Sequence, residues 1–136
     1  MVIFSTELIA QRKSVPGLTA LVVDDNPRIR GMFAAAFLSN GFKICVEAEN
    51  GKEGIEAASR IKPDVITLDY SMPVMGGLEA APVLRQLFPR TPIILFTLNG
   101  GSLFMLNASK AGVNLVLPKN VPLPTLLYVA HELIGD

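Results

Sequence analysis

The chain has 136 residues, of which half are apolar and 18% are charged. This length and composition fit one globular domain with a core of its own and exclude an intrinsically disordered chain. Basic and acidic residues number 12 each, so the chain has no overall positive field that would attract nucleic acid. We therefore expect no direct binding of nucleic acid by this chain.

Cysteine usage and the N-terminal pattern favour a cytoplasmic protein. Cys45 is the only cysteine, and we interpret it as a small thiol packed within an apolar segment. Residues 1–17 place their apolar residues before the basic pair Arg12-Lys13, which is the reverse of a secretory signal. No run approaches the ~20 apolar residues that a membrane span needs. We expect an N-terminal extension at 1–17, one folded domain at 18–136, and no contact with a membrane.

Five short runs rich in apolar and β-branched residues predict strands. Their hydrophobicity is nearly continuous rather than alternating, which is typical of parallel strands covered on both faces. The predicted strands are Thr19–Val23, Ile44–Ala48, Val65–Leu68, Ile93–Thr97 and Asn114–Leu117.

The segments between and after these strands carry apolar residues at helical spacing. The first helix ends near Asn40-Gly41, and its inward face is predicted to contain Ile29, Met32, Phe33, Ala36 and Phe37. The other helices are predicted at about 52–61, 78–88, 102–111 and 124–134. Pro82 is compatible with the third helix only in or near its first turn. Five successive strand–helix units predict an α/β fold, a doubly wound parallel sheet with helices on both faces.

Three carboxylates follow two of the predicted strands. Asp24 and Asp25 come directly after the first strand, and Asp69 follows the third. In the doubly wound order 2-1-3-4-5 these strands are neighbours, so the three side chains converge beyond their carboxyl ends. Two like charges about 4 Å apart repel by roughly 4 kcal/mol at an effective dielectric constant of ~20. Asp24-Asp25 alone would be a turn and a helix cap, but three carboxylates together indicate a hard divalent cation such as Mg²⁺.

Asp69 also has the chemistry of a phosphoryl acceptor, since enzymes use aspartyl-phosphates as covalent intermediates. Phosphoryl transfer depends on positioning and on positive charge against the phosphoryl oxygens. Lys119, just past the fifth strand, can supply such a charge, and Thr97, at the end of the fourth strand, can donate from its hydroxyl. Either residue alone would be unremarkable, but both stand at strand ends beside the predicted pocket.

Two longer motifs stand at these strand ends: Asp24-Asp25-Asn-Pro, and Asp69-Tyr-Ser-Met-Pro-Val-Met-Gly-Gly. With Thr97 and the pair Pro118-Lys119, they resemble the receiver domains of bacterial two-component response regulators, from about Thr19 to Ile134. The resemblance implies a five-stranded sheet of flavodoxin-like order 2-1-3-4-5.

For the site, the resemblance implies that Asp69 is the phosphoacceptor and that Thr97 and Lys119 bind the phosphoryl group. The implied Mg²⁺ ligands are Asp24, Asp25, Asp69 and the main-chain carbonyl of Ser71. The implied donor is a phosphohistidine on a sensor histidine kinase or a histidine phosphotransfer protein. The chain would then be a signalling domain of a phosphorelay and not an enzyme.

Three positions depart from the family pattern. The residue three before the lysine is commonly aromatic and is here Val116; the residue after the threonine is usually small and is here Leu98; and Asn120 replaces a common proline. A valine cannot perform the movement of an aromatic ring, and Leu98 is expected to crowd the route to Asp69. We therefore predict a weaker or differently routed switch. His131, in the last helix, is expected at the surface and not as a phosphoryl donor.

The fourth helix contains four consecutive apolar residues, Leu103 to Leu106, which the core can cover only in part. Tyr128 and Val129 lie off the inward stripe of the last helix in the same way. We expect an apolar surface around the fourth and fifth helices that binds a second copy or a partner. The alternative is an irregular helix that buries most of these residues.

Two other functions remain open. The first is a receiver-like interaction module that does not depend on phosphorylation, which Val116 and Leu98 favour. The second is a metal-dependent hydrolase that uses Asp69 as a turnover nucleophile. The second is opposed by the Asp24-Asp25 spacing, which is not Asp-x-Asp, and by the absence of an evident general base in the sequence near Asp69.

Overall fold

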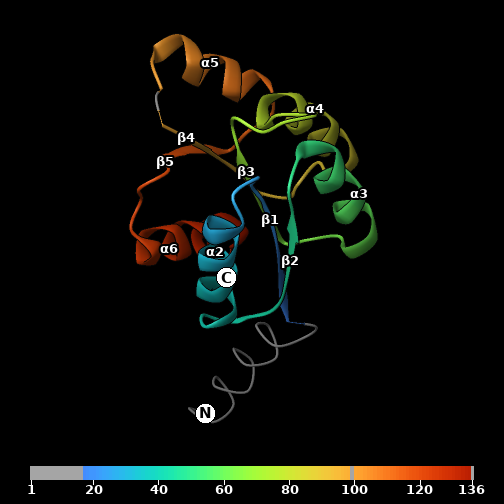
Figure 1. Ribbon diagram of the computed structural model, residues 1–136, viewed down its shortest axis with the longest axis vertical. Helices are drawn as coiled ribbons and strands as arrows, with labels where there is room; N and C mark the ends of the chain where they lie inside the picture. Colours follow the sequence, from blue (N-terminus) through green and yellow to red (C-terminus); the bar gives the residue numbers. More distant parts are fainter. Residues whose placement is uncertain (1–16, 99, 136) are drawn as a thin grey trace.

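The computed structural model describes residues 17–98 and 100–135. Its centre is a five-stranded parallel sheet of order β2-β1-β3-β4-β5 (Figure 1). The strands are β1 (Leu18–Val23), β2 (Phe42–Ala48), β3 (Val65–Asp69), β4 (Ile93–Thr97) and β5 (Leu115–Pro118). The predicted fold class and strand order are confirmed, and the predicted strand bounds agree within two residues. The predicted N-terminal extension lies outside the described residues except for Gly17.

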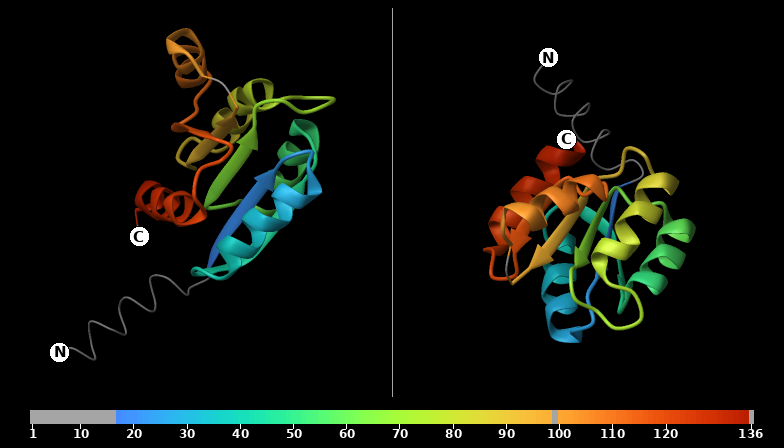
Figure 2. Two further views of the ribbon diagram at one scale, coloured as in Figure 1. Left: turned by 60° about the vertical axis from the view of Figure 1, so that its left-hand side comes forward. Right: turned by 90° about the horizontal axis from the view of Figure 1, so that it is seen from above.

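Five helices connect or follow the strands. They are α2 (Pro27–Leu38), α3 (Gly51–Ile61), α4 (Gly77–Leu87), α5 (Ser102–Lys110) and α6 (Leu123–Ile134). Figures 1 and 2 show α2 and α6 on one face of the sheet and α3 and α4 on the other. Ala108 of α5 packs in the same core cluster as α3 and α4. In the described part of the chain, no helix is both long enough and apolar enough to span a membrane.

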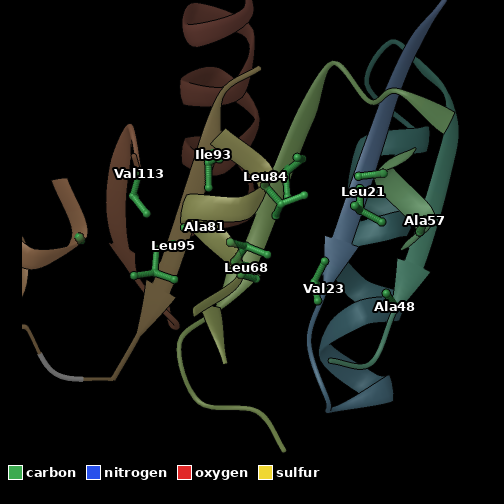
Figure 3. Packing of buried hydrophobic residues seen from close by; sticks show 14 residues of the cluster. Leu21, Val23, Ala48, Ala57, Leu68, Ala81, Leu84, Ile93, Leu95 and Val113 are labelled. Atoms are coloured by element: carbon green, nitrogen blue, oxygen red, sulfur yellow. The ribbon is translucent and has the colours of Figure 1, made fainter. Parts of the chain in front are cut away.

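The sheet separates two hydrophobic clusters because successive side chains of a strand point to opposite faces. On β1, Leu21 and Val23 belong to the cluster under α3, α4 and α5 (Figure 3), whereas Ala20 and Val22 belong to the cluster under α2 and α6. The four side chains are at most 1% exposed. This two-sided burial explains the continuous apolar runs in the sequence.

Several predicted orientations were wrong. Met32, predicted to face inward, is 49% exposed, because Ala34 takes a buried place beside Phe33 and Phe37. Val129, predicted to face outward, is half-buried against the cluster under α2 and α6. Pro82, expected in or near the first turn of its helix, is the sixth residue of α4 and lies in the second turn, exposed to solvent.

Cys45 is less buried than the sequence predicted, and His131 is less exposed. Cys45 is half-buried, and burial, with a smaller contribution from Glu47, raises the pKa of its thiol to about 12. His131 is half-buried rather than at the surface: its Nε2 lies 3.0 Å from the main-chain oxygen of Asn40, and its ring contacts Phe42. His131 therefore joins α6 to the end of α2.

Candidate functional site

The three predicted carboxylates converge at the carboxyl ends of β1 and β3. Asp24 and Asp25 follow β1, Asp69 ends β3, and one oxygen of each side chain lies within 4.8 Å of the others. Asp24 and Asp69 are each 3% exposed, while Asp25 is exposed. The parallel pairing of β1 with β3 places these ends side by side, as the sequence predicted.

Local hydrogen bonds fix Asp24 at the end of β1. Its main-chain N–H donates to the carbonyl of Ala48 at 3.0 Å, which extends the pairing with β2. Its Oδ1 accepts from the N–H of Asn26 at 2.8 Å. Asn26 in turn caps α2, because its Oδ1 accepts from the N–H groups of Arg28 and Ile29. Asn26 therefore both caps the first turn of α2 and holds the carboxylate of Asp24 in place.

Lys119 enters the same pocket from the end of β5. Its Nζ lies 3.0 Å from Oδ2 of Asp69 and 3.5 Å from Oδ2 of Asp24, and its side chain is 20% exposed. Burial by itself lowers the pKa of Lys119, but the contacts with Asp69 and Asp24 outweigh it and the pKa is raised. Lys119 is thus held as a cation against both carboxylates.

Asp69 occupies an unfavourable place for a charge. Its Oδ2 is buried and has no hydrogen bond of good geometry among the described residues, so its contact with Lys119 is an ion pair. Burial raises the pKa of Asp69; Lys119 and the N–H of Ser71 oppose this rise, and the charge of Asp24 adds to it. One lysine beside three carboxylates leaves an excess of negative charge. The donor set and its charge fit a hard divalent cation with oxygen ligands.

A hollow of about 230 Å³ opens beside Asp69 and is lined by Asp69, Tyr70, Ser71, Thr97, Leu98 and Lys119. Thr97 is 7% exposed, and its main-chain oxygen accepts from the N–H of Lys119 at 3.2 Å. Leu98 lines the hollow but is 81% exposed, so most of its side chain lies in solvent. The structure therefore brings Ser71, Thr97 and Lys119 to one opening at Asp69. A hollow of about 780 Å³ between α2 and α6 contains none of these residues.

An aromatic contact that the sequence did not predict lies next to the pocket. The rings of Tyr70, which directly follows Asp69, and Phe104 of α5 meet edge to face at 5.0 Å. Val116 is half-buried and packs, like Phe104, against the cluster under α3, α4 and α5. Aromatic residues occur throughout the chain, so their spacing alone did not identify this pair.

The chain is thus a doubly wound α/β domain with an acidic pocket and a lysine at the carboxyl ends of its strands. The response regulator receiver domain model matches residues 20–131. The chain belongs to this family, and the resemblance seen in the sequence is confirmed. Receiver domains bind Mg²⁺ at an acidic pocket, and the cluster of Asp24, Asp25 and Asp69 could hold such an ion.

Individual relatives agree with this assignment. The chemotaxis protein CheY of Thermotoga maritima is 33% identical over 96 residues, which cover 71% of this chain and 80% of that protein. A protein-glutamate methylesterase/protein-glutamine glutaminase of Hahella chejuensis is 37% identical over 105 residues, but the match spans only 30% of that enzyme. The structure of CheY4 of Vibrio cholerae has a TM-score of 0.80 at 28% identity, with 85% of this chain and 98% of that chain covered.

Proposed function

We propose that the chain is a cytoplasmic phosphoacceptor domain that receives a phosphoryl group on Asp69 in a Mg²⁺-dependent reaction. The observation that carries the proposal is the placement of Asp69: a buried carboxylate in ion-pair contact with Lys119, beside two further carboxylates, at an open hollow. The donor is a phosphohistidine of a sensor histidine kinase or a histidine phosphotransfer protein. The domain signals by its phosphorylation state and does not turn over a substrate.

In the proposed reaction, a carboxylate oxygen of Asp69 attacks the phosphorus atom of the phosphohistidine. The new O–P bond forms as the N–P bond breaks, and the electron pair of that bond returns to the imidazole nitrogen of the donor. Asp24, Asp25, Asp69 and the main-chain carbonyl of Ser71 would hold Mg²⁺, which supplies positive charge against the phosphoryl oxygens when bound.

Lys119 and Thr97 have complementary roles in this proposal. The ammonium of Lys119, now 3.0 Å from Asp69, would contact a phosphoryl oxygen, and the hydroxyl of Thr97 would donate to another. These contacts exist only when the phosphoryl group is present, so they favour one arrangement of the loops after β3, β4 and β5. A near-complete switch from 1:99 to 99:1 needs about 5.5 kcal/mol of differential stabilisation.

The test is incubation with acetyl phosphate and Mg²⁺ followed by mass spectrometry of the intact chain. We expect one acid-stable, base-labile phosphoryl adduct per chain that is lost in Asp69→Asn and when Mg²⁺ is chelated. An adduct that persists in Asp69→Asn would contradict the proposal. Repeated release of phosphate without a stable adduct would indicate a hydrolase instead.

A second candidate is an interaction module that works without phosphorylation. Val116 in place of an aromatic residue and the exposed Leu98 at the pocket favour it, because both stand where the family's relay would begin. Bound metal without any adduct on Asp69 would support this function over the first.

For the output, we propose that the apolar surface of α5 binds a second copy of the chain. Leu103, Met105 and Leu106 are 71%, 46% and 51% exposed, so the helix does not bury most of its apolar residues. Tyr128 is also exposed but lines the hollow between α6 and α2, so it is not assigned to this surface. We expect the mass in solution to increase after acetyl phosphate treatment and to remain that of a monomer in Leu106→Ser. An unchanged mass in the wild type would favour a different partner.

A further inference from the structure

Arg30, in the first turn of α2, contacts the loop that carries two of the three clustered carboxylates. Its Nη1 donates to the main-chain oxygen of Asp24 at 2.8 Å, and its Nε donates to Oε1 of Glu47 at 3.2 Å. The Arg30 side chain is 16% exposed, and Glu47 lies on the neighbouring strand β2. None of the proposed roles in phosphorylation uses Arg30.

The contact completes the fixation of the Asp24 main chain. The N–H of Asp24 is held by the carbonyl of Ala48, and its carbonyl is held by Arg30. With both groups fixed, the peptide plane between Asp24 and Asp25 cannot rotate without breaking a hydrogen bond from a charged donor. The orientation of this plane determines where Asp25, the most exposed member of the carboxylate cluster, directs its side chain.

We propose that Arg30 is a positioning residue for the divalent cation: it holds the Asp24–Asp25 peptide so that both carboxylates face Asp69, and Glu47 orients Arg30. The inference rests on the proposed Mg²⁺ site of the phosphorylation reaction. Groups that orient metal ligands through hydrogen bonds typically change metal affinity 10- to 100-fold when they are removed.

Charge alone would have the opposite effect, which makes the proposal easy to separate from a simple electrostatic one. An arginine close to the carboxylates opposes the binding of a cation, so loss of its charge should tighten Mg²⁺ binding. Loss of a positioning contact should weaken it. An exposed ion pair such as Arg30–Glu47 contributes little by itself to stability, since Glu47 is 40% exposed.

The experiment measures Mg²⁺ affinity of the full chain by titration calorimetry at fixed ionic strength. In Arg30→Met we expect the dissociation constant to rise about 10-fold or more. Arg28→Met is the matched control, because Arg28 is exposed on the same helix and loses the same charge; its dissociation constant should stay within about 2-fold. Arg30→Lys keeps the charge but not the fork of donors, and we expect an intermediate value.

Substitutions of Glu47 separate its charge from its hydrogen bond to Arg30, because Glu47→Gln loses only the charge and Glu47→Ala loses both. The amide oxygen can still accept from Nε of Arg30, so we expect nearly normal Mg²⁺ affinity, whereas Glu47→Ala should resemble Arg30→Met in direction. Thermal unfolding of each variant without metal shows whether it is folded. An unchanged or lower dissociation constant in a folded Arg30→Met would overturn the proposal.

Labelling by acetyl phosphate distinguishes this inference from the proposed function. We expect Arg30→Met to regain wild-type labelling when the Mg²⁺ concentration is raised in proportion to its dissociation constant. A wild type that binds Mg²⁺ but is never labelled would contradict phosphorylation of Asp69 and leave the role of Arg30 to the affinity measurement. A wild type that binds no Mg²⁺ would overturn both.

Discussion

The carboxylate pocket and the surface of α5 both lie beyond the carboxyl ends of strands of the same parallel sheet. Their side chains differ in burial and in how far contacts within the chain fix their positions. Asp24 and Asp69 are 3% exposed and have defined ionic or hydrogen-bond contacts. On α5, Leu103 and Leu106 are 71% and 51% exposed. The chemistry of the pocket is therefore determined within the chain, whereas the proposed output depends on what covers the α5 surface.

The largest effect is expected from removing the cation of the pocket. Lys119→Met should slow labelling of Asp69 by acetyl phosphate about 10²–10³-fold, because a positioned donor to developing charge contributes that much to catalysis. Lys110→Met on the exposed side of α5 is the control and should label normally. The rates are measured by intact mass at saturating Mg²⁺. A rate within 2-fold of wild type in Lys119→Met would contradict the role of Lys119 and the conclusion that contacts within the pocket determine its chemistry.

The second effect concerns the support beneath the α5 surface. The guanidinium of Arg85, on α4, donates to the carbonyls of Phe88, Pro89, Thr91 and Gly112 and to Oδ1 of Asn114. These bonds join the end of α4 to the segment between α5 and β5. Arg85→Met should lower the free energy of unfolding by about 3 kcal/mol, since hydrogen bonds to charged groups are the stronger ones and several carbonyls lose their donor.

Urea unfolding checks this value, with exposed Arg90→Met just beyond α4 as the control that should change it by less than about 0.5 kcal/mol. Labelling of Asp69 in the folded Arg85→Met chain should remain near normal if the pocket is determined independently of α5. A loss of labelling as large as that of Lys119→Met would show that the two regions are coupled.

The third effect is a dependence of the free energy of unfolding on pH that comes from Asp69. Because burial raises the folded-state pKa of Asp69 above 3.8, the native state binds more protons than the unfolded state between these two values. The free energy of unfolding of the wild type therefore falls as the pH rises from about 3.8 to the raised pKa of Asp69, and it remains at the lower value at higher pH. Asp69→Asn, which is neutral at every pH, should be the more stable protein at pH 7 without Mg²⁺, and this advantage should shrink toward pH 3.8.

Mg²⁺ should reverse that order, because a ligand at about 100 times its dissociation constant stabilises the native state by about 2.7 kcal/mol. The wild type should gain this amount and Asp69→Asn much less. Urea unfolding at pH 4, 5.5 and 7, with Mg²⁺ or with a chelator, measures both trends. A wild type that exceeds Asp69→Asn in stability at pH 7 without metal would mean that the contact with Lys119 outweighs burial.

The same comparison explains which parts of the structure were predictable. The alternation of strands and helices follows from apolar periodicity, whereas the order 2-1-3-4-5 was implied by the resemblance to receiver domains. Given that order, the geometry of parallel strands predicted the convergence of Asp24 with Asp69. The orientation predicted for Met32 was wrong, because a helix that carries both Ala34 and Met32 can bury either side chain. Packing against the sheet determines which of the two is buried. Spacing along the chain could not reveal the bonds of Arg30, since its partner Glu47 lies on another element. The edge-to-face contact of Tyr70 with Phe104 was missed for the same reason.

The smallest predicted effect tests whether the pocket side of the molecule stores backbone strain. Val74, in the loop between Asp69 and α4, has φ of +67° with its side chain 75% exposed, a conformation that a β-branched residue rarely adopts. Val74→Gly should raise the free energy of unfolding by about 1 kcal/mol, because the strain relieved outweighs the added freedom of glycine in the unfolded chain. Val83→Gly, within α4, should instead lower it, by about 0.5 kcal/mol from helix propensity and by a further contribution from the buried part of the Val83 side chain, which is 40% exposed. Equal destabilisation by both substitutions would show that the loop is unstrained. Labelling of Asp69 that slows several-fold in Val74→Gly would show that the strained loop helps to hold the pocket.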